Sequence, residues 1–384
     1  MRAETYDLTR SLAKARCDGI GLGATRYASV TEVVSRLLAV QAQEPEFSRW
    51  SVAQRLGSAH DAAVVAALDS GEIVRTHVLR PTWHYVMGED LRWLQALCGP
   101  SVRRLSAGWY RNYGVDDEFL GVTRDQLVSS LQGGRAKTRN ELRGELSAAG
   151  FDVSGQRLTA ALIDAELRAL ICSGPLAGKH HTYALVEERL SPAPAVDEEE
   201  AVAKLVRRYL AGHAPASLKD LRWWSTLTLK RLRAAVESLG DEVAGEVVDG
   251  VEYLYLTETG AASRARAPAS LRAEPDGPPR FELLQVFDEL FVGYSETRGL
   301  IDPDGEYGSV LPIGFSKMMH VVLEDDRLVG RWRRDKRSAK DGGGQVLGIQ
   351  LTRPMSEAEL AELERAASRY GDFVGLETSV ELLS

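Results

Sequence analysis

The sequence predicts an α+β fold built from small repeated modules, and three observations carry that prediction. Amphipathic helical periodicity dominates the first two thirds of the 384 residues. Within that part, residues 123–187 and 201–256 each show three helical segments followed by a β-hairpin, the element order of a winged-helix domain. After residues 264–280, which hold four of the fourteen prolines, the pattern changes to short strands. We therefore expect three tandem winged-helix domains followed by a C-terminal β-rich domain.

The first winged-helix domain is expected over residues 1–115. A capping box of Ser29 and Glu32 opens an amphipathic helix. That helix must end near Gln41, because Glu44 precedes Pro45 and is pushed out of the helical region. Residues 71–86 alternate and are rich in β-branched and aromatic side chains, which predicts two short strands broken by a proline. These strands would form the wing of the first domain, so the same module occurs three times.

The second and third winged-helix domains are expected over residues 116–192 and 198–262. A capping pattern at Thr123 predicts the start of the first helix of the second domain. In the third domain the pair Asp249 and Gly250 predicts a tight hairpin turn. The C-terminal β-rich domain, residues 280–384, is expected to hold strands at 281–293, 310–313, 320–323, 327–332, 345–351 and 376–383, with a helix at 356–370.

Charge and composition exclude several classes of protein. Acidic residues outnumber basic ones, 55 to 47, and the formal net charge of −8 argues against a protein that coats nucleic acid through bulk charge. No apolar run approaches the ~20 residues of a membrane span, so we expect no membrane partner and a cytoplasmic location. Three widely spaced cysteines predict neither a disulfide framework nor a zinc site, and we expect no metal and no cofactor.

Basic clusters are nevertheless present on the predicted modules. The segment 331–340 carries six positive residues and one negative residue. Any single cluster is most simply a solvated surface, but on winged-helix modules the clusters together predict a phosphate-contacting surface. The candidate DNA contacts are Arg80, Thr82, His84, Lys137, Arg139, Lys179, Lys230, Arg331 and Arg333. A structural role in the core is an equal alternative for His84.

Several stretches together resemble one family, the tandem winged-helix DNA glycosylases of the AlkZ/YcaQ type. They are LLAVQAQEP (37–45), VRTHVLRPTWHYV (74–86), GPLAGKHHTYALVEER (174–189), DLRWWSTLT (220–228), FELLQVFDELFVGYSETRG (281–299) and DDRLVGRWRRD (325–335). The resemblance implies a concave DNA-binding channel surrounded by the four domains. It also implies that Gln41 and Gln43 form the Gln-x-Gln catalytic motif of the AlkZ-like branch, while Asp288 is expected to be structural.

Glutamine can serve a reaction whose leaving group is already activated. An N7-alkylated purine is cationic, so its glycosidic bond is weakened and no strong general acid is needed. Cleavage passes through an oxocarbenium-like sugar, and a glutamine carbonyl oxygen can orient water while directing a negative dipole at that sugar. The expected activity is that of a monofunctional DNA N-glycosylase on N7-alkylpurines, with bulky adducts and interstrand crosslinks as further substrates.

The expected setting is DNA repair or self-resistance to a genotoxin, with the protein acting as a monomer on double-stranded DNA in the bacterial nucleoid. The alternative is a winged-helix transcriptional regulator without enzymatic activity. A regulator would normally carry a dimerisation helix, and none is evident in the sequence.

Overall fold

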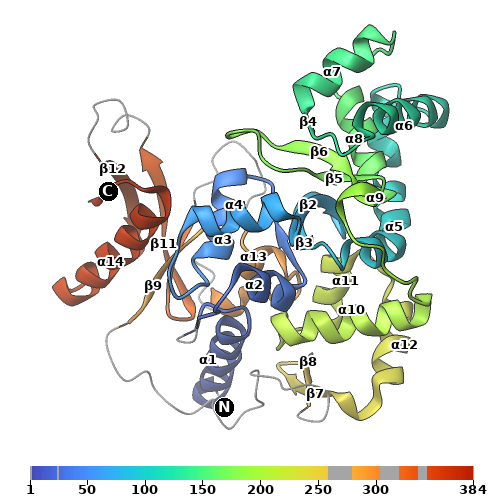
Figure 1. The fold of residues 1–384 in the computed structure, drawn as a ribbon. Helices are drawn as coiled ribbons and strands as arrows, with labels where there is room; N and C mark the ends of the chain where they lie inside the picture. Colours follow the sequence, from blue (N-terminus) through green and yellow to red (C-terminus); the bar gives the residue numbers. More distant parts are fainter. Residues whose placement is uncertain (1, 24–25, 258–278, 303–319, 336–343, 384) are drawn as a thin grey trace.

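The computed structural model describes residues 2–23, 26–257, 279–302, 320–335 and 344–383. Figure 1 shows helices and small sheets distributed along the chain, which confirms the mixed α and β fold. The chain begins with α1 (Arg2–Gly19). In Figure 1 the blue elements, up to about residue 87, lie at the centre, with the C-terminal sheet to their left and the green and yellow helices to their right.

One order of elements recurs in three modules. The first module, residues 30–87, contains α2 (Val30–Leu37), β1 (Ala39–Gln41), α3 (Pro45–Ala53), α4 (Asp61–Ser70), β2 (Ile73–Val78) and β3 (Arg80–Met87). The second module, residues 117–185, contains α6 (Asp117–Leu131), β4 (Lys137–Thr138), α7 (Arg139–Ala148), α8 (Arg157–Leu167), β5 (Ile171–Ser173) and β6 (Thr182–Leu185). Their three-stranded sheets have the same order, β1-β3-β2 and β4-β6-β5.

The third module, residues 198–256, is a reduced version of the same arrangement. It contains α10 (Glu198–His213), α11 (Leu218–Ser225), α12 (Leu229–Leu239), β7 (Val243–Val248) and β8 (Val251–Leu256). A single bridge between Ala216 and Leu254 takes the place of the first strand. The modules are joined by α5 (Leu91–Asn112) and by the short α9 (Val186–Arg189), and a 3-10 turn (Gly240–Glu242) precedes β7. Three helices followed by a hairpin is the order that the sequence predicts, whereas the short strands β1 and β4 are not part of that prediction.

The local signals explain where these elements begin. Thr138 and Glu141 form the capping box of α7, and Asp249 and Gly250 both take positive φ angles in the predicted turn between β7 and β8. The prediction of a helix start at Thr123 is wrong, because α6 begins earlier, at the N-cap Asp116. The Thr123 hydroxyl instead donates to a carbonyl one turn back inside the helix.

Two predicted strand boundaries also differ from the structure. Pro81 lies inside β3 rather than between the two strands, because the turn is made by Leu79 with a φ of 62°. The proline is tolerated there because Pro81 has no pairing partner in β2: the register passes from Arg80 to Trp83 at an irregularity beside the turn. The expected strand over 281–293 is shorter and is followed by a helix, and the expected strand at 310–313 lies outside the described residues.

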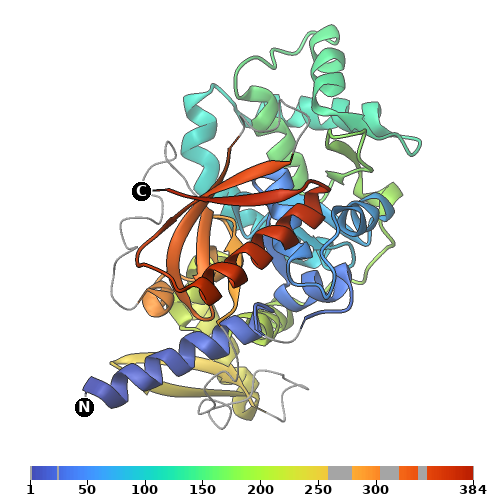
Figure 2. The same cartoon turned by 90° about the vertical axis from the view of Figure 1, so that its left-hand side faces the viewer.

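The C-terminal region forms one five-stranded sheet in the order β13-β12-β11-β10-β9. Figure 2 shows its helix α14 lying across the sheet. The elements are β9 (Phe281–Leu284), α13 (Glu289–Val292), a 3-10 turn (Arg298–Ile301), β10 (His320–Glu324), β11 (Arg327–Asp335), β12 (Gln345–Leu351), α14 (Glu357–Val374) and β13 (Thr378–Leu382). Only the β12–β13 pair is parallel among the described strands.

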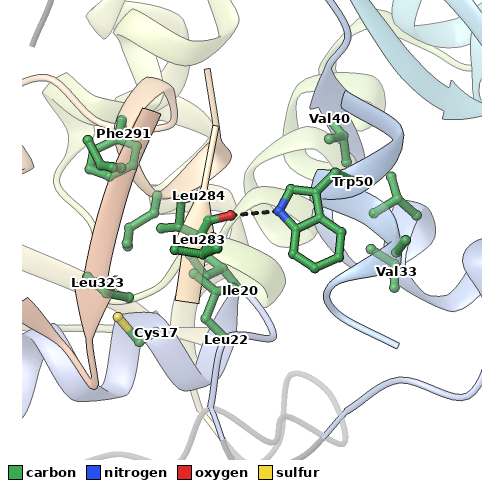
Figure 3. Packing of buried hydrophobic residues seen from close by; sticks show 14 of the residues in the cluster. Cys17, Ile20, Leu22, Val33, Val40, Trp50, Leu283, Leu284, Phe291 and Leu323 are labelled. Atoms are coloured by element: carbon green, nitrogen blue, oxygen red, sulfur yellow. Dashed lines mark hydrogen bonds between the residues drawn. The ribbon is translucent and has the colours of Figure 1, made fainter. Parts of the chain in front are cut away.

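A shared core attaches the first module to the C-terminal sheet. Figure 3 shows the Trp50 ring among apolar side chains from both regions, with its Nε1 donating to the Leu283 carbonyl at 2.6 Å. Beside this contact, Arg55 and Asp288 form a fully buried ion pair at 2.8 Å, and Asp288 also caps α13. The structural role expected for Asp288 is therefore confirmed. A buried pair of this kind is strongly destabilising when one partner is removed, so it fixes α13 against the first module.

No described helix combines the length and apolar character that a membrane span requires. The three cysteines are buried and free. Among the described side chains, no three of His, Cys, Asp and Glu come together as a metal site.

Candidate functional site

Gln41 lies at the end of β1, where the first module meets α13. The helix before it ends at Leu38, whose φ of 61° turns the chain into the strand. Gln41 pairs with His84 of β3 and is 4% exposed. Its backbone N–H donates to the Glu289 carboxylate at 2.9 Å, and its side-chain Oε1 accepts from Arg80 Nη2 at 3.0 Å. Both ends of this glutamine are therefore held by charged side chains.

Gln43 lies two residues further along the same extended segment. Its Oε1 accepts a long hydrogen bond of 3.4 Å from the Trp83 backbone N–H, and its side chain is half-buried. Ala42 continues the pairing with β3, since its N–H donates to the Trp83 carbonyl at 2.7 Å. Both glutamines therefore lie at the same end of β1, but only Gln41 is among the residues that line the cavity beside it.

A cavity of about 980 Å³ lies beside Gln41. This volume is at the upper end for small-molecule sites, which are typically about 300–1,000 Å³. Its walls come from the first module, α5, α11 and the segment around α13, so separate parts of the chain meet there. The lining residues are Gln41, Arg80, Pro81, Thr82, Leu105, Lys219, Arg222, Trp223, Thr226, Val286, Phe287, Phe291, Val292, Ser295, Glu296 and Arg298.

Two large apolar side chains are exposed in the cavity wall. Trp223 is 48% exposed and Leu105 is 61% exposed. The Trp223 ring is nevertheless fixed, because its Nε1 donates to the Val292 carbonyl at 3.1 Å and the Arg298 guanidinium lies 5.7 Å from the ring centre. A fixed, exposed aromatic face is suited to stacking against a flat ligand.

Charge around the cavity is mainly positive. Lys219, Arg222 and Arg298 line it, and the one carboxylate among the described lining residues, Glu296, forms an ion pair with Lys219. The phosphate backbone of DNA is attracted to such a surface. Arg298 is partly buried, and burial lowers its pKa.

The predicted wing residues have different positions relative to this cavity. Thr82 lines it, and its Oγ1 is buried without a partner in the described structure. Arg80 is 8% exposed and also lines it, whereas His84 is fully buried. Burial and the nearby Arg80 charge hold the pKa of His84 well below its usual value, so this ring is neutral. A core role for His84 agrees with this placement.

The other predicted DNA contacts lie outside the described cavity lining. Lys137 pairs with Glu145, and Arg139 donates to the Thr159 hydroxyl at 2.7 Å. Lys179, Lys230 and Arg333 are exposed, Arg331 is half-buried, and residues 336–340 of that basic segment lie outside the described residues.

The sequence prediction missed five residues of this site: Lys219, Arg222, Trp223, Glu289 and Arg298. A signal for Trp223 existed, because two adjacent tryptophans on a helix cannot both face the core. Trp224 is buried, so Trp223 must point outward beside Arg222. Glu289 also had a signal in the sequence, because it stands within a mainly apolar run. A carboxylate buried in such a run needs a polar partner.

Comparisons with known proteins agree with this arrangement. The structure is similar to that of the Streptomyces sahachiroi DNA glycosylase AlkZ, with a TM-score of 0.76 and 22% sequence identity over 97% of this chain and 99% of that chain. At this identity the likeness shows the fold. A comparison with curated proteins finds no match. The model of the family described as DNA glycosylase AlkZ-like matches residues 34–373, which include both glutamines and all the cavity-lining residues. This protein therefore belongs to the AlkZ-like DNA glycosylase family.

Proposed function

We propose that this protein is a monofunctional DNA glycosylase that hydrolyses the N-glycosidic bond of cationic N7-alkylated purines in double-stranded DNA. The observation that carries the proposal is the position of Gln41 at the wall of a large cavity with a cationic and aromatic lining. Family membership favours this activity over the alternative of a transcriptional regulator.

The proposed chemistry uses water held by glutamine. The Gln41 carbonyl oxygen has two lone pairs, and Arg80 occupies one of them. The other can accept a hydrogen bond from water, while Gln43, two residues away, can orient the same water from a second side. The dipole of the amide carbonyl would stabilise the positive sugar as the neutral base departs. A neutral amide is a poor base, so only an activated leaving group should react.

The three modules support a proposed tandem winged-helix arrangement, with domains at 1–115, 116–192, 198–262 and 280–384 around a concave DNA channel. All three modules have three helices followed by a hairpin, and the first two share one sheet order, which supports a helix-turn-helix variant with a wing. Lys219, Arg222 and Arg298 would contact phosphates beside Gln41. Exposed Lys179, Lys230 and Arg333 remain proposed contacts along the channel, with the protein bound as a monomer.

The cavity also supports bulky substrates, including interstrand crosslinks. A methyl group would leave most of its 980 Å³ unused. Trp223 and Leu105 offer apolar surface to a larger substituent on N7. Such a substrate is consistent with a role in repair of alkylated DNA or in resistance to a genotoxin.

The activity can be tested with a DNA duplex that contains one N7-methylguanine. After incubation, heating in alkali converts abasic sites into strand breaks, which are counted on a gel. We expect product from the wild type and a large loss in Gln41→Ala and Gln43→Ala, with DNA binding retained. Gln132→Ala, at an exposed glutamine of the second module, is the matched control and should keep full activity. Absence of abasic product from the wild type would overturn the proposal.

A further inference from the structure

Arg80 is a buried arginine whose guanidinium faces acceptors on every side. Its Nη2 donates to Gln41 Oε1 at 3.0 Å and to His84 Nε2 at 3.3 Å. Its Nη1 is directed at the carbonyls of Trp224 and Val292, at 3.4 and 3.3 Å. These acceptors belong to the first module, α11 and α13. The side chain thus connects Gln41 to the two other parts of the cavity wall.

The protonation state of His84 fixes which atom donates in the hydrogen bond between Arg80 and His84. Its Nδ1 lies 2.9 Å from the Thr82 carbonyl, which can only accept, so Nδ1 carries the proton. Nε2 is then the unprotonated nitrogen and accepts from Arg80. Because burial and Arg80 both keep the pKa of His84 well below its usual value, this arrangement persists at neutral pH.

The main chain of Gln41 is held from the opposite side. Glu289 accepts from the Gln41 N–H, while its other oxygen accepts from Trp224 Nε1 at 3.0 Å. His213 Nε2 lies 3.3 Å from that same oxygen. Glu289 is fully buried. The backbone and the amide of Gln41 are therefore fixed by two separate groups, an anion and a cation.

A glutamine amide needs such a partner to present a defined atom. The last torsion of glutamine is broad, so the carbonyl oxygen and the amide nitrogen can exchange places at little cost. A guanidinium accepts no hydrogen bonds, and it therefore selects the oxygen. With one lone pair of Oε1 bound to Arg80, the direction of the second lone pair is set.

We propose that Arg80 is a positioning residue for Gln41, which fixes the amide so that Oε1 faces the attacking water. This inference rests on the proposed glycosylase function. It also changes the role expected for Arg80, since a buried guanidinium with its Nη atoms occupied by protein acceptors is not available to phosphate in this conformation.

The test is a double-mutant cycle on single-turnover excision of N7-methylguanine from duplex DNA. The variants are Arg80→Met, Arg80→Lys, Gln41→Ala and the two combinations with Gln41→Ala, each checked by its unfolding temperature. Arg16→Met is the matched control, because Arg16 is another buried arginine that donates to main-chain carbonyls, those of Thr297 in the C-terminal region and Pro215 in the third module, at 2.8 Å each. No hydrogen bond between Arg16 and Gln41 is present among the described residues. Affinity for unmodified DNA is measured alongside.

We expect Arg80→Met to slow excision about 10- to 100-fold with DNA affinity changed less than about threefold, as for loss of a charge-assisted hydrogen bond. Arg80→Lys should recover part of the rate, and the loss should vanish in the Gln41→Ala background. The folded fraction of Arg16→Met should excise N7-methylguanine at the wild-type rate.

A normal rate in Arg80→Met, or a loss that is independent of Gln41, would overturn the positioning role while leaving the glycosylase proposal intact. If Arg80→Met does not fold, Arg80→Lys alone decides, because a rate equal to that of the wild type would overturn the proposal. A wild type without abasic product would overturn both.

Discussion

The first and second modules share one order of elements but differ at the junction between their first strand and the next helix. In the second module Thr138 ends β4 and directly caps α7, with Glu141 completing the capping box. The third module does the same with Ser217 and Asp220. In the first module, three residues separate Gln41 from α3, and the N-cap Glu44 makes no side-chain capping bond.

The candidate site therefore lies where the first module lacks a capping bond that the other two modules have. The extra residues carry Gln43, and the proline that starts α3 keeps the segment before it extended. Loss of a cap costs about 0.5–2 kcal/mol, a departure from local preference of the kind expected at functional sites.

The surroundings of the strand differ as well. Gln41 is covered by α13 and is 4% exposed, whereas Lys137 and Thr138 of β4 are half-buried and lie against their own module. Of the two strands, only β1 has an end that is covered by α13 and lines the cavity.

The largest effect is expected from substitutions at the ends of the two equivalent strands, β1 and β4. We predict that Gln41→Ala slows single-turnover excision by roughly 100- to 1,000-fold, the range for loss of a preorganised catalytic dipole. Thr138→Ala at the corresponding strand end should lower the free energy of unfolding by about 1 kcal/mol through loss of the cap and leave the rate unchanged. Similar rate losses in both variants would refute the functional difference between the modules.

The second prediction compares the third and second modules at the position six residues after the residue that caps the second helix. Trp223 occupies this position after Ser217, whereas Gly144 occupies it after Thr138. We predict that Trp223→Ala weakens excision of a purine with an aromatic N7 substituent by about tenfold, in line with about 1–3 kcal/mol per stacked ring. Excision of N7-methylguanine should change less, and Gly144→Ala should affect neither substrate. Equal losses on both substrates would exclude Trp223 as a contact for the adduct.

The smallest effect concerns pH. Gln41 pairs with His84, while Thr138 of the second module pairs with Thr182. Since the folded pKa of His84 lies well below the unfolded value of about 6.5, the unfolded state binds more protons and stability falls as pH decreases below that value. His181 and His320, with pKa values lowered to about 3 and about 4, act in the same direction.

Unfolding temperatures measured from pH 7.5 to 5 should therefore decrease in the wild type. His84→Thr, which copies the second module, should show a shallower decrease. An unchanged pH slope in His84→Thr would contradict the neutral buried state of His84.

Local sequence signals accounted for much of the fold. Thr138 with Glu141, Ser217 with Asp220 and the Asp249-Gly250 turn each act within a few residues, so their structures could be predicted. The start of α6 was missed because the same residue types that cap a helix also occur inside one.

The site was predicted less completely, for a physical reason. Gln41, which the sequence singles out, lines the cavity, but Glu289 lies 248 residues from Gln41 and meets it only through tertiary packing. The density of basic residues selected Lys137 and Lys230, while Arg222 and Lys219 line the cavity. Density in sequence does not specify which face of a helix a side chain occupies.

The most direct test of the central claim is the excision rate on two duplexes that differ only in the leaving group. One carries a single N7-methylguanine and the other a single uracil at the same position, and loss without enzyme is subtracted. Because glutamine-held water requires an activated leaving group, we predict abasic product from the N7-methylguanine duplex and none from the uracil duplex. Product from uracil at a comparable rate, or none from N7-methylguanine, would contradict the account.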